Sequence, residues 1–218
     1  MILSIRNSLL FFAFLGIWIS CGNIQKKRPL PFYNHPDFTP EWIEENNKNY
    51  PSIHTIPAFS FTDQDGMAVT EKTVEGKIYV VNFIFTRCGS ICPKMTENMG
   101  ILQKAFIDDP RVLLLSHSVT PYWDSVPVLK HYAERNKIVS SKWHLLTGNK
   151  DQIYEIAKKQ YFAGDSVGYY GEKKDFLHTE HFILVDAHRR IRGIYNGTLP
   201  LEMERLKDDI HTLEEVKQ

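Results

Sequence analysis

Residues 77–94, KIYVVNFIFTRCGSICPK, join an unbroken apolar run to a pair of cysteines. The run over 77–85 is rich in β-branched and aromatic residues, which favours a central strand that is buried on both faces. Pro93 follows the second cysteine at a position suited to the first turn of a helix, and apolar residues then recur at helical spacing. This stretch therefore predicts a buried strand that leads into a helix, with Cys88 and Cys92 at the junction.

The segments around this stretch predict alternating strands and helices. They are, in order, a β-hairpin over 58–70, a strand over 111–119, a helix over 125–136, a strand over 143–148, a helix capped by Asn149, a hairpin over 181–197 and a helix from Pro200. Residues 163–177 have no periodicity, which predicts a long loop before the penultimate strand. Alternation of this kind implies parallel strands with right-handed crossovers. The predicted fold class is α/β: a thioredoxin-like fold with an N-terminal β-hairpin and an inserted loop before the penultimate strand.

Residues 1–20 differ in composition from the rest of the chain. Arg6 precedes an apolar core over 9–19, which is shorter than the roughly 20 residues that a membrane-spanning helix needs. The segment therefore predicts a lipoprotein-type signal peptide. The residues around Cys21 resemble the bacterial lipobox, whose cysteine becomes the lipidated first residue, although Trp18 stands where that motif usually has leucine. An uncleaved anchor is the alternative, and both interpretations place the folded part on the periplasmic side, tethered to the membrane.

Residues 21–57 are polar, contain several prolines and lack periodicity, so they predict a membrane tether or linker before a domain over 58–218. One short helix is expected over 38–46, with Thr39 as its cap. Lysine plus arginine and aspartate plus glutamate number 26 each, so no global charge attracts nucleic acid. We expect no nucleic-acid partner.

If Cys21 carries lipid, the folded part keeps two cysteines, four positions apart. A disulfide that closes so short a loop stabilises little, so the pair favours redox chemistry or metal binding. Positions four apart share a face of a helix, and a helix N-terminus favours thiolates. Thiolates are soft ligands that prefer Cu(I) and also accept zinc. The sequence therefore predicts a dithiolate site at Cys88 and Cys92.

A dithiolate metal site needs at least one further ligand. His178 follows the long loop and precedes the strand that starts at residue 181. In a thioredoxin-like fold, the loop that enters this strand lies beside the cysteine motif. His178 is therefore the preferred candidate, and His181, three residues later, is the alternative.

Two stretches carry a resemblance to a known family. FTRCGSICPKMTENM, residues 85–99, and LHTEHFILVD, residues 177–186, resemble the Sco/SenC family, whose members are needed to assemble the copper centre of cytochrome c oxidase. The similarity extends from about residue 58 to the last helix. It implies that Cys88, Cys92 and His178 are ligands of Cu(I) or Cu(II), and that the copper-bearing subunit of cytochrome c oxidase is the partner.

The sequence departs from the family pattern at two positions. Ser90 stands where many members have an acidic residue, and Thr120 precedes Pro121 where an Asp-Pro pair is common. Asp124 lies nearby and could orient a ligand. We expect it instead to be the N-cap of the helix over 125–136.

The predicted function is a membrane-tethered copper metallochaperone. The alternative is a thiol–disulfide oxidoreductase that reduces the cysteines of a copper-accepting partner, with Cys88 and Cys92 as its redox-active pair. The wide cysteine spacing and His178 favour metal binding. A peroxidase of the peroxiredoxin kind is disfavoured, because Thr86 lies two residues before Cys88 and not three.

Overall fold

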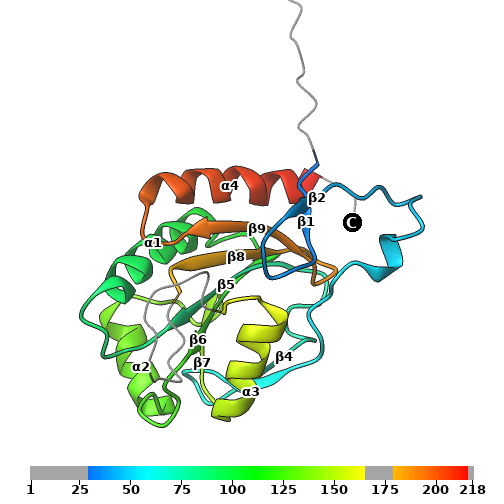
Figure 1. The fold of residues 1–218 in the computed structure, drawn as a ribbon. Helices are drawn as coiled ribbons and strands as arrows, with labels where there is room; N and C mark the ends of the chain where they lie inside the picture. The colour runs from blue at the N-terminus through cyan, green and yellow to red at the C-terminus, as the bar shows by residue number, and fades with distance from the viewer. Residues whose placement is uncertain (1–28, 165–178, 216–218) are drawn as a thin grey trace, which may run out of the picture.

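The computed structural model describes residues 29–164 and 179–215, and its centre is a five-stranded sheet (Figure 1). The strand order is β7-β6-β5-β8-β9, in which β5, β6 and β7 are parallel while β8 is antiparallel to both β5 and β9. The strands are β5 Ile78–Ile84, β6 Val112–Ser118, β7 Trp143–Leu146, β8 His181–Val185 and β9 Ile191–Asn196. The predicted thioredoxin-like α/β arrangement is confirmed.

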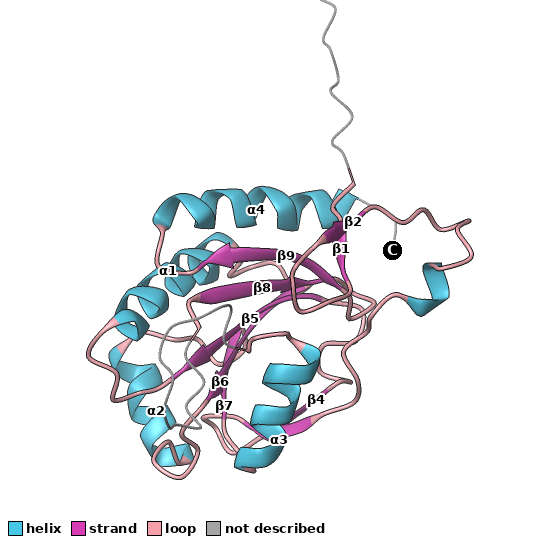
Figure 2. Ribbon diagram, viewed as in Figure 1, coloured by secondary structure: helices cyan, strands magenta, loops and turns pink. Residues whose placement is uncertain are grey.

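Helices cover both faces of the sheet, so the molecule has three layers (Figure 2). One face packs against α1, α2 and α4, and the other packs against α3, the π-helix η2 and the β3–β4 hairpin. The helices are α1 Ile91–Ala105, α2 Val126–Arg135, α3 Lys150–Glu155, η2 Ile156–Gln160 and α4 Pro200–Glu215. The Asn149 side chain accepts a hydrogen bond of 3.1 Å from the Gln152 N–H, which confirms the predicted cap of α3.

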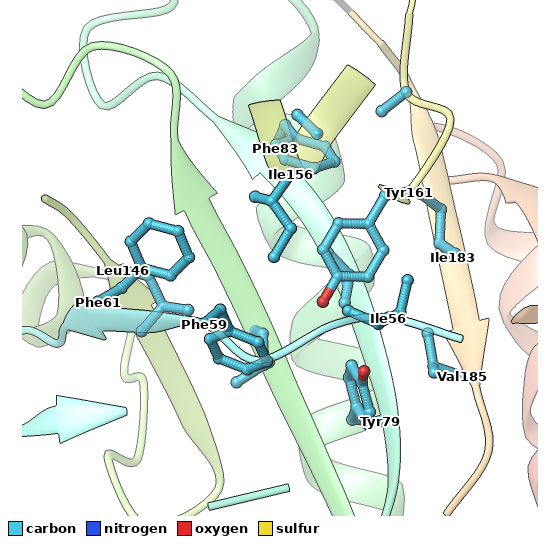
Figure 3. Packing of buried hydrophobic residues seen from close by; sticks show 14 of the residues in the cluster. Ile56, Phe59, Phe61, Tyr79, Phe83, Leu146, Ile156, Tyr161, Ile183 and Val185 are labelled. Carbon is cyan, nitrogen blue, oxygen red and sulfur yellow. The ribbon is translucent and has the colours of Figure 1, made fainter. Parts of the chain in front are cut away.

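Strand β5 is buried along its whole length, as its sequence predicts. Val80 and Ile84 pack toward α1, whereas Tyr79 and Phe83 pack into the cluster on the opposite face. Figure 3 shows that second cluster, in which Tyr79 and Phe83 lie with Tyr161. Because apolar side chains are buried on both faces, β5 is fixed in register, and the residue at which it ends is fixed as well.

The predicted first hairpin forms from β3 Ser60–Thr62 and β4 Ala68–Thr70, with Gly66 at φ +76° in the turn. This positive φ is the reason a glycine suits the position. Thr62 and Thr147 exchange two backbone hydrogen bonds of 2.8 and 2.9 Å, which attach the hairpin to the end of β7.

Residues 29–57 pack against the domain and do not form the coil expected of a linker. Strand β1 Phe32–Tyr33 pairs with β2 Pro40–Glu41, and the 3₁₀ helix η1 Tyr50–Ser52 follows. The expected helix over 38–46 is wrong, because the residues that would start it are paired in β2.

The contacts that hold this segment come from far along the chain. Arg192 in β9 donates hydrogen bonds to the carbonyl oxygens of Pro31 (3.0 Å) and Leu30 (2.6 Å), and its guanidinium lies 4.1 Å from the centre of the Phe32 ring. Local periodicity in the sequence does not predict contacts between residues so far apart, so the sequence analysis did not identify them. The membrane-tether role of residues 21–57 stays a prediction. Within the described ranges, no helix has the length and apolar character needed to span a membrane.

Candidate dithiol site

Cys88 and Cys92 lie at the junction of β5 and α1, as the sequence predicts. Cys92 is in the first turn of α1, but Cys88 precedes the helix, in a turn closed by a 3.0 Å hydrogen bond from its N–H to the Phe85 carbonyl. The two residues therefore do not share a helical face, and that expectation is corrected. The turn instead folds Cys88 back over the helix N-terminus, where the Ser90 N–H donates to the Cys88 sulfur over 3.5 Å.

The two thiols are free, and their environments differ. Cys88 is partly exposed, and its pKa lies below the usual value for a cysteine. Its partial burial acts to raise the pKa. Hydrogen bonds from the backbone of Cys92, Ser90 and Ile91 and from the Cys92 thiol stabilise the thiolate and outweigh that effect. Cys92 is buried, and burial, helped by the neighbouring Cys88 sulfur, raises its pKa to about 12. Cys88 is therefore the accessible, more acidic thiol, and Cys92 is the protonated inner thiol.

This asymmetry suits two kinds of chemistry. In thiol–disulfide exchange, a thiolate at a helix N-terminus attacks and a buried neighbour resolves the mixed disulfide. In metal binding, a soft ion displaces the remaining proton and binds both sulfurs. The geometry of the two cysteines permits either.

Asp124 forms a hydrogen bond to the turn that carries Cys88, through the Thr86 hydroxyl. The expectation that it caps α2 is wrong, because Ser125 occupies the N-cap position. Asp124 is instead fully buried and accepts hydrogen bonds from the hydroxyls of Thr86 (2.5 Å), Ser118 (2.5 Å) and Thr120 (3.0 Å). The carboxylate thereby joins the end of β6 to the residue two positions before Cys88.

The sequence carried a signal for this network. Hydroxyl residues stand at the carboxyl ends of both β5 and β6, and those ends meet at one edge of a parallel sheet. A buried carboxylate in that position needs several donors. The pairing of Asp124 with Thr86 could have been inferred from topology, but not from local spacing.

His178, the predicted third ligand, lies outside the described residues. The structure does place the start of β8 at the relevant edge, since Val81 in β5 pairs with Ile183 and the antiparallel β8 begins where β5 ends. Within the described parts of the chain, no group of three or more histidine, cysteine, aspartate or glutamate residues could hold a metal ion.

His181, the alternative ligand, is occupied elsewhere. Its ring packs edge-to-face on Phe38 with 5.5 Å between centroids, and burial lowers its pKa, with Glu180 opposing the effect. Because side chains alternate along a strand, His181 shares a face with Ile183, which packs in the cluster opposite α1. His181 therefore points away from the face that carries α1 and Cys92.

A groove of about 580 Å³ lies between the β3–β4 hairpin and α3. Phe59, Phe61, Gln152 and Ile156 are among its lining residues, and neither cysteine is. The dithiol site is thus separate from this groove and lies at the edge of the sheet.

The fold and the paired cysteines at the β5–α1 junction define a thioredoxin-like protein with an accessible dithiol. The chain matches the SCO1/SenC family model over residues 47–214, and it belongs to that family.

Solved structures of family members agree with this assignment. A SCO1/SenC family lipoprotein from Bacillus anthracis is 30% identical, with a TM-score of 0.65 over 79% of this chain and 100% of that one. BsSco, a Sco-family cytochrome c oxidase assembly protein with a disulfide switch, is 29% identical, with a TM-score of 0.62 over 76% and 96%. Arabidopsis thaliana ScoI, solved with copper bound, is 24% identical, with a TM-score of 0.56 over 73% and 98%, and shows the shared fold.

Proposed function

We propose that this protein is a membrane-tethered copper metallochaperone that serves the assembly of the copper centre of cytochrome c oxidase. The observation that carries the proposal is the pair of free thiols, one accessible and one buried, at the N-terminus of α1 in a chain of the SCO1/SenC family. Copper is the cargo. Handing it on requires a site of low coordination number that a partner's thiolate can enter, and the partly exposed Cys88 provides that entry.

The proposed ligands are Cys88, Cys92 and His178. Two thiolates and one imidazole suit three-coordinate Cu(I), and a further ligand or water would suit Cu(II). The antiparallel pairing of β8 with β5 supports the choice of a residue just before β8. The packing of His181 on Phe38 supports His178 over His181.

Substituting the two histidines tests this choice. His178→Ala is expected to weaken Cu(I) binding by about a hundredfold, because one of three ligands is lost, while His181→Ala changes it by less than about threefold. Competition with a coloured Cu(I) chelator measures both affinities. Melting curves serve as the control for folding, and a larger copper-binding loss in His181→Ala would show that the wrong histidine has been chosen.

A thiol–disulfide reductase is the second candidate function, and the different pKa values of the two cysteines favour it specifically. The Cys88 thiolate would attack a partner's disulfide, and Cys92 would then displace the partner's thiolate, leaving a Cys88–Cys92 disulfide and a reduced partner. A disulfide switch is described for BsSco, a member of the same family.

A transfer experiment separates the two functions. The reduced full chain, loaded with one Cu(I), is mixed with the copper-accepting domain of the oxidase subunit whose thiols are already reduced. The metallochaperone is expected to transfer copper to this acceptor, as metal analysis after separation would show. A parallel reaction mixes the reduced, copper-free chain with the oxidised acceptor. If copper stays on the chain in the first reaction and acceptor thiols appear in the second, the reductase is the function.

We also propose that Cys21 carries a lipid that anchors the protein on the periplasmic side of the membrane. The lipobox-like sequence supports this, and so does the lipoprotein relative from Bacillus anthracis. Cys21→Ser is expected to move the protein from the membrane fraction to the soluble fraction without altering copper binding. Retention of the variant in the membrane would instead identify residues 1–20 as an uncleaved anchor.

A further inference from the structure

Two exposed aromatic rings lie together in one turn, and one of them contacts Arg87, the residue before Cys88. Tyr122 and Trp123, in the turn between β6 and α2, are 64% and 46% exposed, and their ring centres are 5.4 Å apart. The guanidinium of Arg87 lies 4.3 Å from the centre of the Trp123 ring. Single exposed apolar residues are ordinary, but two adjoining rings and an arginine form a composite surface. We call Arg87, Tyr122 and Trp123 the aromatic platform.

Hydrogen bonds fix the backbone of the turn that carries the two rings of the platform. The N–H groups of Trp123 and Asp124 both donate to the Thr120 carbonyl, over 2.8 and 2.9 Å, which closes the turn. Asp124 in turn binds the Thr86 hydroxyl, so the turn that carries the rings and the turn that carries Cys88 form one hydrogen-bonded unit. A surface whose backbone is fixed in advance loses less conformational entropy when it binds.

The position and charge of the platform indicate what it binds. Arg87 immediately precedes Cys88, so a partner that reaches the Cys88 sulfur comes close to the platform. Among the described residues, Arg87 has no hydrogen bond or ion pair to a carboxylate, and its guanidinium lies over the Trp123 ring. An exposed guanidinium without a carboxylate partner among the described residues favours an acidic partner. Tryptophan, tyrosine and arginine are also the residues most often found at the energetic centre of protein interfaces.

We infer that the aromatic platform docks an acidic segment of the thiol-bearing protein that exchanges copper or disulfides with Cys88. The inference deepens the proposed function and rests on it, since it names the chemistry of the partner at the same site. Contact with Trp123 supplies apolar area, and Arg87 selects for carboxylates next to the partner's cysteine. The platform thereby orients the incoming thiol toward Cys88.

The test uses the full chain with Cys21→Ser and Cys92→Ser, so that Cys88 is its only thiol, activated as the mixed disulfide with thionitrobenzoate. Three synthetic peptides differ only in the residues beside a single cysteine, which are glutamate, glutamine or lysine. Attack of the peptide thiolate on the Cys88 sulfur forms a peptide–Cys88 disulfide and releases thionitrobenzoate, whose absorbance gives the rate. Each rate is divided by that of the same peptide with bis(2-hydroxyethyl) disulfide, which removes differences in peptide reactivity.

The glutamate peptide is expected to react about tenfold faster than the lysine peptide at low salt, with a smaller preference at high salt. Arg87→Gln is expected to abolish this preference, and Trp123→Ala to slow the glutamate peptide several-fold. Trp42→Ala is the matched control, because Trp42 is 63% exposed in the N-terminal segment and should leave the rates unchanged. Melting curves check that each variant is folded.

Equal normalised rates for the three peptides would overturn the inference, and so would a Trp42→Ala effect as large as that of Trp123→Ala. Self-association of the chain that disappears in Trp123→Ala would also overturn it, since the platform would then bind a second copy. Copper titration of the reduced chain separates the proposed metallochaperone function from the proposed docking role of the platform. A peptide preference without copper binding refutes the metallochaperone and keeps the platform, whereas copper binding without a preference refutes the platform alone.

Discussion

The reduced protein is expected to bind one copper ion tightly, and the Cys88–Cys92 disulfide form is expected to bind it about a thousandfold or more weakly. Oxidation removes both soft ligands together and leaves at most an imidazole from the proposed set. Competition titration with a Cu(I) chelator under anaerobic conditions measures the two affinities. Cys88→Ser and Cys92→Ser should each resemble the oxidised form more than the reduced one.

The controls for this experiment come from the same chain. Cys21→Ser keeps both site thiols and should bind copper as the parent protein does. Copper binding should also tighten as the pH rises, by up to about tenfold per pH unit, because binding displaces the proton of Cys92, whose pKa is about 12. Equal copper stoichiometry and affinity in both redox states would remove the cysteines from the proposed site.

Acidification is expected to destabilise the fold through His117. This histidine is fully buried in β6 among Phe61, Phe83 and Tyr161, with ring centroids 5.1 to 5.9 Å away. Neither of its ring nitrogens has a hydrogen-bond partner in the described structure, and burial lowers its pKa from 6.5 to about 3. The folded protein therefore keeps this ring neutral under conditions in which the unfolded chain protonates it.

The sign of the effect follows from proton linkage. Well above pH 6.5 the ring is neutral in both the folded and the unfolded state, so it does not change the free energy of unfolding. As the pH falls from 6.5 toward 3, the unfolded chain binds the proton and the folded protein does not, so the free energy of unfolding decreases by up to about 5 kcal/mol. Urea denaturation at a series of pH values measures this loss.

His117→Phe should remove the His117 part of this loss and so flatten the pH dependence, since a phenyl ring suits the aromatic surroundings and does not titrate. His131→Gln, at an exposed position of α2, is the control and should keep the slope of the parent protein. If His117→Phe loses stability between pH 6.5 and 3 as steeply as the parent, another buried group carries the acid sensitivity.

Local patterns predicted the central parts of the fold correctly. The apolar run over 77–85 identified β5, and the alternation of strands and helices identified the order of the elements and the fold class, because burial on both faces and helical periodicity are written directly in the residue order. The N-terminal segment was misjudged for the opposite reason. Its order depends on Arg192, some 160 positions later, and on strand pairs of only two residues each.

The sequence by itself determined that two cysteines stand where a buried strand meets a helix, because that junction is encoded within 18 consecutive residues, 77–94. Only the tertiary structure decided that the cysteines are unequal. Cys88 lies outside the helix and accepts hydrogen bonds from its first N–H groups, while Cys92 is buried. Tertiary structure also brought Asp124 to Thr86 and the Trp123 ring to Arg87. These contacts join residues 36 or more positions apart, and they arise because parallel pairing of β5 and β6 places the carboxyl ends of both strands at one edge of the sheet.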